Sequence, residues 1–272
     1  MTSKSTESTP QEDLAPRQPS PPRVNAVTAE DITASLKAGF ADFLSRPLMS
    51  GFFGLFYAVF GILLIWCLVW LDMLWIVIPA LVAFPLIAPF AAAGLYEMSR
   101  RLQRNESFGW SDILTVMANQ RKREMGWMAF VTLFILWVWF YQFRTVLVIV
   151  LQDSSFSDLD GFLNTVFFTP EGWTFLLIGT GVGALLSAVL FSATVVAMPM
   201  LLDREMDFIT AMITSFGVVR KSPAVMLGWA AIIAVTMLLS MVPAFLGLVF
   251  TLPILGHTTW HLYQRAVAPV EA

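Results

Sequence analysis

The sequence contains two histidines, His257 and His261, which lie four residues apart. Residues at i and i+4 of a helix share one face, a turn apart, so the two imidazoles can bind one metal ion. Glu97 and Asp203 are candidates for further ligands. Glu97 and His261 each follow a proline by eight residues, and Asp203 and His257 each follow one by four. These residues predict a divalent-metal site at one end of a helical bundle.

Two other interpretations of the same four residues stay open. They can form a structural polar cluster, bonded to one another, to backbone carbonyl groups or to lipid headgroups. They can also handle a proton or another ligand. We favour the structural cluster, because the four residues are expected near the water boundary of a membrane, where polar groups cost less than at its centre.

The segments that must position these side chains are strongly apolar. Hydrophobic residues make up 57% of the sequence and charged residues 13%, whereas a typical soluble domain is about 25% charged. Residues 222–264 contain no Asp, Glu, Lys or Arg, and residues 47–96 contain one, Asp72. Each stretch can cross a bilayer twice, because one helical span needs about 20 apolar residues. The sequence therefore predicts an integral membrane protein.

The apolar stretches predict an all-α, polytopic membrane fold with six transmembrane helices. The expected spans are residues 48–71, 74–99, 125–150, 172–201, 225–240 and 244–263. Only Asp72 and Met73 separate the first two spans, so these form a tight hairpin. Prolines recur in the even-numbered spans, where they are expected to cause kinks or to free backbone carbonyl groups.

A repeated unit organises the spans. Aspartates at positions 31, 112 and 207 each open a short amphipathic segment that precedes two apolar stretches. The first and third copies align without a gap at a spacing of 176 residues, whereas the middle copy has Arg121 where an apolar residue is expected. We predict three tandem repeats of an amphipathic interfacial helix plus a two-helix hairpin. The repeats cover about residues 29–108, 109–203 and 204–266 of a membrane domain at 29–266.

The amphipathic segments are expected to lie in the membrane interface. In the first, Ile32, Leu36, Phe40 and Phe43 recur at steps of four, four and three residues, which places them on one helical face. The third copy has apolar residues at the equivalent positions. Such a helix should turn its apolar face into the bilayer and its basic residues toward anionic lipid.

Lysine and arginine residues predict the orientation in the membrane. Fifteen of the sixteen fall in the N-terminal tail, in the amphipathic segments or at one end of the spans, whereas the opposite loops are acidic. Both termini are therefore expected in the cytoplasm. Residues 1–28 are polar and rich in Ser, Thr and Pro, so we predict a disordered cytoplasmic tail. Order should begin at a capping box formed by Thr28 and Asp31.

Two further features lie inside the predicted spans. Arg144 is the one basic residue within a span and is expected near its outer end, where it extends toward the acidic loop at residues 152–171. A substrate or gating charge is the alternative interpretation. Gly179, Gly183 and Ser187 recur every four residues, a spacing of small residues that favours close approach of another helix.

Four stretches carry a resemblance to a known family. They are Arg-Pro-Leu at 46–48, Gly-Leu-Tyr-Glu-Met-Ser-Arg-Arg at 94–101, Pro-Met-Leu-Leu-Asp-Arg at 199–204 and Leu-Pro-Ile-Leu-Gly-His-Thr-Thr-Trp-His-Leu-Tyr at 252–263. On these residues the sequence resembles, over roughly residues 28–266, a family of bacterial, largely proteobacterial, predicted integral membrane proteins classed as a domain of unknown function. The resemblance implies a bacterial inner-membrane location and no established activity.

Some members of that family are labelled cytochrome c oxidase subunit I. A haem held by two histidines needs them on opposite faces of the ring, normally from different helices. His257 and His261 share one face of one helix, so they cannot supply such a pair. A catalytic oxidase subunit is therefore excluded, whereas an accessory role beside a respiratory complex is what the resemblance still implies.

The functional prediction is correspondingly coarse. The sequence shows no Ser-His-Asp set, P-loop or dinucleotide fingerprint, so nothing argues for an enzyme, and no nucleic-acid partner is predicted. We predict a non-enzymatic scaffold or accessory factor, in contact with the bilayer and with a membrane protein complex. A small-solute or ion transporter is one alternative, although the mid-span residues are almost wholly apolar. A metal-dependent membrane enzyme built on Glu97, Asp203 and the two histidines is the other.

Overall fold

A computed structural model describes residues 22–120, 124–152 and 159–269 of the chain. Within these ranges the chain is helical, apart from turns, short extended segments and one isolated β-bridge between Val24 and Val267. In chain order, the elements are α1 (Ala29–Ser45), α2 (Pro47–Trp70), α3 (Leu74–Ala83), the 3₁₀-helix η1 (Phe84–Ile87), α4 (Ala88–Ala91), α5 (Ala93–Gln103), α6 (Trp110–Gln120), α7 (Glu124–Leu151), α8 (Leu159–Phe168), α9 (Pro170–Thr194), α10 (Ala197–Asp203), α11 (Phe208–Lys221), α12 (Pro223–Met241) and α13 (Leu248–Ala266). The all-α prediction is confirmed for the part of the chain that the structure describes.

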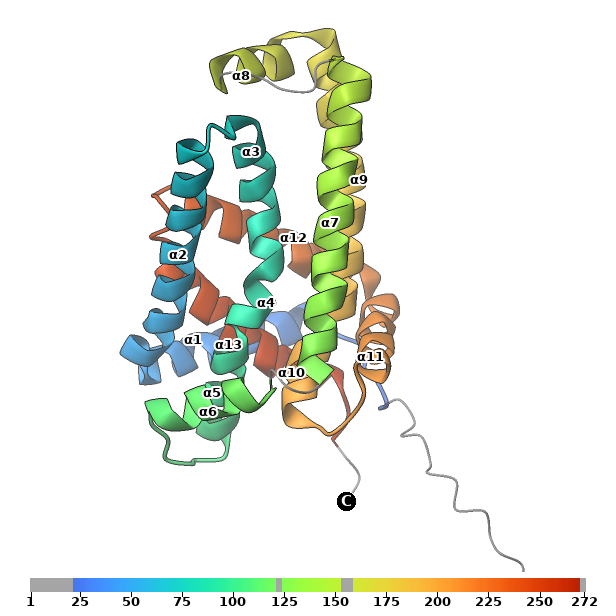
Figure 1. Cartoon of the computed structure of the whole chain (residues 1–272). Coiled ribbons are helices and arrows are strands. Elements are labelled where there is room, and N and C mark those ends of the chain that lie inside the picture. Colours follow the sequence, from blue (N-terminus) through green and yellow to red (C-terminus); the bar gives the residue numbers. More distant parts are fainter. Residues whose placement is uncertain (1–21, 121–123, 153–158, 270–272) are drawn as a thin grey trace, which may run out of the picture.

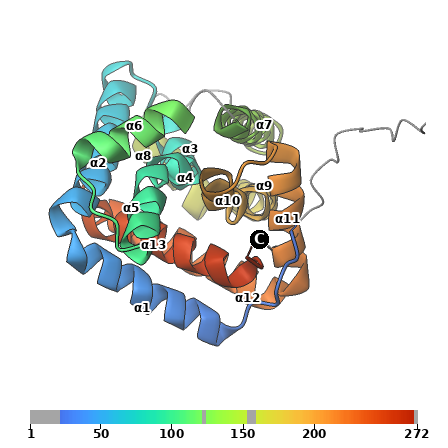
Figure 2. The ribbon, with the colours of Figure 1, turned by 90° about the horizontal axis from the view of Figure 1, so that it is seen from below.

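The helices divide the molecule into an upper part of long helices and a lower end of short ones. The α2–α3 hairpin stands on one side, and the packed pair α7 and α9 on the other, with α8 across the upper end (Figure 1). The helices α1, α5, α6, α10 and α11 gather at the lower end (Figure 1). Seen from below, α1 and α13 run side by side (Figure 2), and the two helices are in contact.

Four helical segments are long and apolar enough to cross a membrane: Pro47–Trp70, Glu124–Leu151, Pro170–Asp203 and Pro223–Met241. They coincide with the first, third, fourth and fifth predicted spans. The second predicted span is divided among α3, η1, α4 and α5. The sixth corresponds to α13, which is not among the four segments. Several spans are therefore present, and the six-span topology stays a prediction.

Prolines account for the interruptions in the even-numbered segments. A proline removes one backbone N–H and clashes with the carbonyl group four residues earlier, which disrupts a regular helix just before it. The 3₁₀ turn of η1 precedes Pro89, and the break at Val195 and Val196 precedes Pro199. At η1 the carbonyl oxygen of Phe84 accepts a hydrogen bond from Tyr57 Oη of α2. The expected departures from regular helix are confirmed at both places, whereas α13 continues through Pro253 as one helix.

A tight turn shortens the last helix relative to the prediction. Residues 242–247 form turns, and Ala244 and Phe245 have positive φ values of 50° and 65°, a region that non-glycine residues adopt at a cost. The Phe245 ring is buried and packs edge-on against Phe84, with ring centroids 5.4 Å apart. This packing holds the turn in place, and α13 begins at Leu248 instead of residue 244.

The segment before α1 forms an extended strap along the C-terminal end of α13. Asn25 N donates to Ala266 O at 2.8 Å, and Ala268 N donates to Arg23 O at 2.9 Å. The capping box of Thr28 and Asp31 is confirmed. Residues 22–28 therefore differ from the predicted tail, because their backbone pairs with the chain beyond α13. Residues 1–21, where the rest of that prediction falls, lie outside the described residues.

Candidate functional site

The helix that carries both histidines lies among three others at the lower end. Glycines permit close approach on each side, because a Cβ atom added to them would meet α13 or its neighbour. Such an atom would lie 2.5 Å from Thr258 N at Gly39 of α1, 2.6 Å from Leu248 O at Gly54 of α2, and 2.7 Å from a Leu95 methyl of α5 at Gly256. α13 is therefore in close backbone contact with α1 and α2, and its backbone at Gly256 packs against the Leu95 side chain of α5.

His257 is fully buried between two serine hydroxyl groups. Its Nε2 lies 3.0 Å from Ser50 Oγ of α2, and its Nδ1 lies 2.7 Å from Ser99 Oγ of α5. Both serines are also fully buried. A neutral imidazole has one donor and one acceptor nitrogen, which two hydroxyl groups can satisfy completely.

His261, one turn later, contacts the carboxylate of Asp42 from α1. The distance from His261 Nε2 to Asp42 Oδ2 is 2.8 Å, and Ser99 Oγ donates to the same oxygen at 2.6 Å. On the other side of the ring, His261 Nδ1 lies 3.2 Å from Gln103 Nε2, and Gln103 Oε1 accepts from Trp260 Nε1 at 2.9 Å. We call these seven side chains the Asp42 network: Asp42, Ser50, Ser99, Gln103, His257, Trp260 and His261.

One assignment of hydrogens satisfies every contact in the Asp42 network. The Trp260 indole can only donate, which fixes the Gln103 amide so that its nitrogen donates to His261 Nδ1. His261 then donates through Nε2 to Asp42. Ser99 also donates to Asp42, so it accepts from His257 Nδ1, and Ser50 donates to His257 Nε2. Two chains of donors thus end on one oxygen, Asp42 Oδ2, an arrangement that favours the ionised carboxylate.

The pKa of Asp42 agrees with this assignment. Burial by itself raises the pKa of the carboxyl group, but hydrogen bonds from His261 and Ser99 and the electrostatic attraction of the two imidazole groups outweigh it, so the pKa lies below its ordinary value. Asp42 is therefore an anion near neutral pH. Its side chain is only 15% exposed, so the two hydrogen-bond donors stabilise the negative charge more than water does.

The network contains the residue types of a serine-histidine pair without the access that catalysis needs. Ser50 and His257 are in hydrogen-bond contact, yet both have a relative exposure of 0%. A nucleophile must reach a substrate atom to attack it. The arrangement is therefore a set of buried hydrogen bonds that holds α1, α2, α5 and α13 together.

Glu97 lies on α5 but belongs to a separate contact. Its side chain is fully buried, with Oε2 2.7 Å from Arg100 Nη2 and Oε1 2.7 Å from Arg101 Nε. The two arginine side chains are about one-fifth exposed. Their guanidinium groups therefore neutralise the buried carboxylate while they remain in partial contact with the surroundings. A buried carboxylate requires such partners, because an unpaired one would be strongly destabilising.

Asp203 joins a third polar group, at the end of α10. Its Oδ2 accepts from Tyr263 Oη at 2.8 Å, and its Oδ1 lies 3.7 Å from Arg104 Nη2. The neighbouring Arg204 donates from Nε to Tyr263 Oη at 2.8 Å and from Nη2 to Ala268 O at 2.7 Å. This group fastens α10 and the end of α5 to the C-terminal end of α13.

The four predicted metal ligands are thus placed at one end of the molecule but in three different contacts. Within residues 22–120, 124–152 and 159–269, no three His, Cys, Asp or Glu side chains are close enough to hold a metal ion together. The two histidines face serines and Asp42, while Glu97 and Asp203 face guanidinium groups. This geometry favours the structural polar cluster over a shared ion.

The two features predicted inside spans lie away from this end. A Cβ atom added at Gly183 of α9 would come within 2.5 Å of the Trp139 ring of α7, whereas one added at Gly179 would meet nothing within 4 Å. Ser187 is half-buried. Close packing is therefore centred on Gly183. Arg144 is exposed on α7, about 30 Å along the helix from Glu124 at 1.5 Å per residue.

Sequence reasoning missed Asp42, Ser50 and Ser99. A signal for Asp42 exists in the repeat, since it aligns at the 176-residue spacing with Val218, which is fully buried in α11. A charged residue at a buried helical position requires a partner. Ser50 opens a run of small residues at every fourth position, with Gly54 and Ala58, and all three are buried. This spacing of small residues predicts close contact with another helix, just as the spacing of Gly179, Gly183 and Ser187 does.

Four helical segments long and apolar enough to span a membrane are typical of a helical integral membrane protein. Residues 76–203 match the family model described as "Predicted integral membrane protein (DUF2189)", which supports the resemblance seen in the sequence. The matched range runs from α3 to α10, so it includes Ser99 and excludes Asp42 and both histidines. No curated protein and no solved structure matches the chain.

Proposed function

We propose that the chain is a six-span protein of the bacterial inner membrane, formed from three repeats, that acts as a non-enzymatic scaffold or accessory factor. The neighbour that the family resemblance suggests is a respiratory complex. The observation that carries the proposal is the use of the buried polar side chains: the Asp42 network joins four helices at one end, and its serine–histidine contacts are closed to substrates.

Contacts of the short helices support the threefold repeat. α6 packs on α5, α11 packs on α9 and α10, and α1 packs on α13. In each case the amphipathic helix of one repeat contacts the second hairpin helix of the repeat before it. The contact between α1 and α13 closes this series into a ring, because it joins the first repeat to the third.

Local geometry relates the first and third repeats more closely. Arg46 and Ser222, 176 residues apart, have φ and ψ of −141° and 58° and of −137° and 61°, and each is followed by a proline at the start of a long helix. The buried positions of α1 also recur in α11. Ser35, Gly39 and Phe43 correspond by this spacing to Ala211, Ser215 and Val219.

The outer faces of the same helices support an interfacial position. The predicted apolar face of α1 is divided, with Ile32 and Phe43 buried and Leu36, Phe40 and Leu44 exposed. α11 likewise exposes Ile209, Ile213 and Phe216. Exposed basic side chains stand beside these faces at Lys37, Arg46 and Arg220. Apolar faces next to basic groups fit the boundary of an anionic leaflet, which supports a cytoplasmic position for this end.

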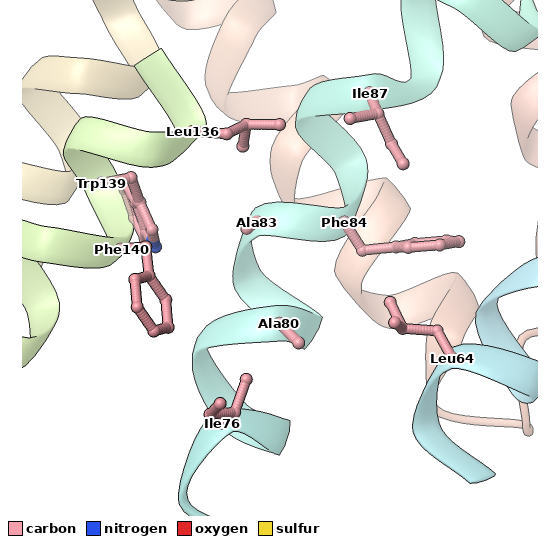
Figure 3. A pocket seen from close by; sticks show the side chains of 9 residues that line it. All are labelled: Leu64, Ile76, Ala80, Ala83, Phe84, Ile87, Leu136, Trp139 and Phe140. Carbon is pink, nitrogen blue, oxygen red and sulfur yellow. The ribbon is translucent and has the colours of Figure 1, made fainter. Parts of the chain in front are cut away.

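The predicted transporter has less support from the geometry. A carrier places substrate groups near the middle of the membrane, where its repeats meet. Here the polar side chains of the Asp42 network lie at one end and are bonded to one another. A pocket between α3 and α7 is lined by apolar and aromatic side chains (Figure 3), which gives an ion or a polar solute no favourable contact.

Lipid retention tests the interfacial part of the proposal. The purified chain should retain phosphatidylglycerol over phosphatidylcholine in native mass spectrometry, and Arg46→Gln with Arg220→Gln should reduce that preference. Glu171→Gln, at the opposite end, is the matched control and should leave it unchanged. Equal retention of both lipids by the native chain would contradict an anionic-lipid surface.

Assembly and transport are tested separately. On native gels of solubilised bacterial membranes, a tagged chain should migrate with a respiratory complex, and loss of the chain should reduce the amount of that complex. In vesicles of phosphatidylcholine and phosphatidylglycerol, the chain should cause no flux of Na⁺, K⁺ or small organic solutes. Flux above that of empty vesicles, without co-migration, would replace the scaffold proposal by the transporter.

A further inference from the structure

α8 lies across the upper end of the molecule and packs with one face on α7 and α9 (Figure 1). Phe162 and Val166 of α8 form one buried cluster with Leu147 of α7 and Phe175 of α9. The rings of Phe162 and Phe175 meet edge-on, with centroids 6.4 Å apart. This packing makes α8 part of the helical bundle, although it is only 10 residues long.

The corner between α8 and α9 fixes the position of α8. Thr169, which separates the two helices, donates from Oγ1 to Thr165 O at 2.7 Å and accepts from Gly172 N at 3.0 Å. A Cβ atom added at Gly172 would overlap the carbonyl oxygens of Thr165 and Val166, so the glycine permits the two backbones to approach closely. α8 is therefore held across the start of α9.

The contact with α7 places α8 at the edge of the hydrocarbon core. α7 has 28 residues, so at 1.5 Å per residue it is about 42 Å long, which matches a bilayer with its headgroup regions. A hydrocarbon core of about 30 Å, centred on α7, leaves about 6 Å of the helix outside it at each end. Leu147 lies four residues before the end of α7, which is also about 6 Å. α8 therefore meets α7 at the depth where acyl chains give way to headgroups.

The exposed side of α8 is divided between polar and aromatic residues. At 100° per residue, Asp160 and Asn164 lie opposite the buried face, and both are exposed. Phe167 and Phe168 lie on either side of this polar strip and are 48% and 81% exposed. Trp173, in the first turn of α9, is 63% exposed. Polar groups directed away from the bundle and aromatic rings at its sides are typical of a helix in the membrane interface.

The charges near α8 differ from those at the lower end. Between residues 159 and 175 the charged residues are Asp160 and Glu171, and the sequence there has no lysine or arginine. Interfacial helices that attract anionic lipid have basic residues on the polar face, as α1 and α11 have at Lys37 and Arg220. Contact of α8 with a bilayer therefore depends on its aromatic side chains and gains nothing from anionic headgroups.

We propose that α8 is an interfacial helix of the leaflet opposite to α1 and α11, and that zwitterionic phospholipid covers its exposed aromatic side chains. Phe167, Phe168 and Trp173 contact the upper acyl chains, while Asp160 and Asn164 face water. Because α11 packs on the other end of α9, the two short helices fix the depth of the α7–α9 pair in the bilayer. This surface goes beyond the scaffold role and does not depend on it, because it needs only that α7 and α9 cross the membrane.

Spin labels on the full chain in phosphatidylcholine nanodiscs test this position. Cys67→Ala removes the single native cysteine, and Phe168→Cys or Asn164→Cys then carries one nitroxide. In electron paramagnetic resonance, the label at 168 should be relaxed more by oxygen, which concentrates in lipid, than by a water-soluble nickel chelate. The label at 164 should show the reverse order. Adding phosphatidylglycerol should change neither result.

Three outcomes would overturn the proposal. Stronger relaxation of the label at 168 by the nickel chelate would mean that α8 extends into water. Relaxation by neither reagent would mean that protein, from a second copy or a partner, covers this surface. A label at 168 that becomes accessible to oxygen only when phosphatidylglycerol is added would mean that α8 requires anionic lipid.

A pair of charge variants makes the test specific. Phe168→Asp places a carboxylate on the side assigned to lipid, so a label at Phe167→Cys should shift toward the nickel chelate and away from oxygen. Asn164→Asp adds the same charge on the side assigned to water, and it should leave that label unchanged. Equal behaviour of the two variants would refute the division of α8 into a lipid side and a water side.

Discussion

α1 and α11 lie 176 residues apart and bury equivalent positions, yet they pack by different chemistry. α1 approaches α13 through Gly39 and reaches into it with Asp42. At the equivalent positions α11 has Ser215, whose hydroxyl accepts a hydrogen bond from Val196 N, and Val218, which is fully buried. The helix ends before the two prolines have nearly the same backbone angles.

This difference between α1 and α11 shows that the helical arrangement does not require polar contacts like those of Asp42. α11 is held against α9 and α10 largely by apolar side chains, so an equivalent helix can pack without a buried carboxylate. The contacts of Asp42 are therefore present in α1 and have no counterpart at the equivalent position of α11. Because a polar network costs more than an apolar contact unless every member is satisfied, its completeness indicates a requirement for a fixed arrangement of α1, α2, α5 and α13.

Placing an acid in α11 at the position equivalent to Asp42 should have the largest effect. Val218→Asp places a carboxylate in the apolar core of α11 without the donors that surround Asp42, and we expect a loss of roughly 3–5 kcal/mol in the free energy of unfolding. Unfolding in mixed dodecyl-maltoside and dodecyl-sulfate micelles, followed by circular dichroism, measures it. Val218→Thr, of the same shape and uncharged, should lose much less. A stable Val218→Asp variant would show that α11 has polar partners like those of α1.

The close approach of α1 to the backbone of α13 gives the next largest effect. Gly39→Ser introduces into α1 the residue that α11 has at the equivalent position. Its Cβ would lie 2.5 Å from Thr258 N, so α1 and α13 must separate, at a cost of about 2–3 kcal/mol. Gly179→Ser, where an added Cβ meets nothing within 4 Å, is the matched control. Equal unfolding free energies for the two variants would contradict the close approach of α1 and α13.

Much of the helical arrangement could be predicted, because it depends on patterns of neighbouring residues in the sequence. Long apolar stretches predicted the four membrane-long helices, and the prolines predicted the interruptions near η1 and before α10. The capping box at Thr28 followed from two residue types at a fixed spacing. The turn at Ala244 could not be predicted, because the positive φ values there depend on the packing of Phe245 against Phe84, which lies far away in the sequence.

The candidate site was harder to predict for the same reason. Pattern and spacing identified the two histidines and the end of the molecule where they lie. Their partners come from α1, α2 and α5, and neither Asp42 nor Ser99 stands out by local spacing. The acids that did stand out, Glu97 and Asp203, face arginines and a tyrosine instead. Tertiary packing determines the partner of each acid. Such contacts join residues far apart in the sequence, so local spacing does not predict them.

Removing the acid from α1 should destabilise the protein less. Asp42→Val gives α1 the residue that α11 has at the equivalent position, but it leaves Ser99 and His261 without their shared acceptor. We expect a loss of about 1–2 kcal/mol in the free energy of unfolding, because a buried hydroxyl and a partly buried N–H lose their partner. If this variant is as stable as the native chain, the network contributes nothing to the helical arrangement.

The smallest expected effect is a dependence on pH that only the native α1 should show. The folded-state pKa of Asp42 is lowered relative to its ordinary value, so its ionised form stabilises the fold above the unfolded pKa of about 3.9, and this contribution is lost as the pH falls through the lower folded value. Asp42→Asn removes that titration and keeps the shape. The caps at Asp31 and Asp207, whose pKa values are also lowered, titrate in both proteins and cancel in the difference. The stability advantage of the native chain over Asp42→Asn should therefore shrink as the pH falls below about pH 4. A difference that grows toward low pH would mean that Asp42 is buried as the neutral acid and that the donors of His261 and Ser99 point elsewhere.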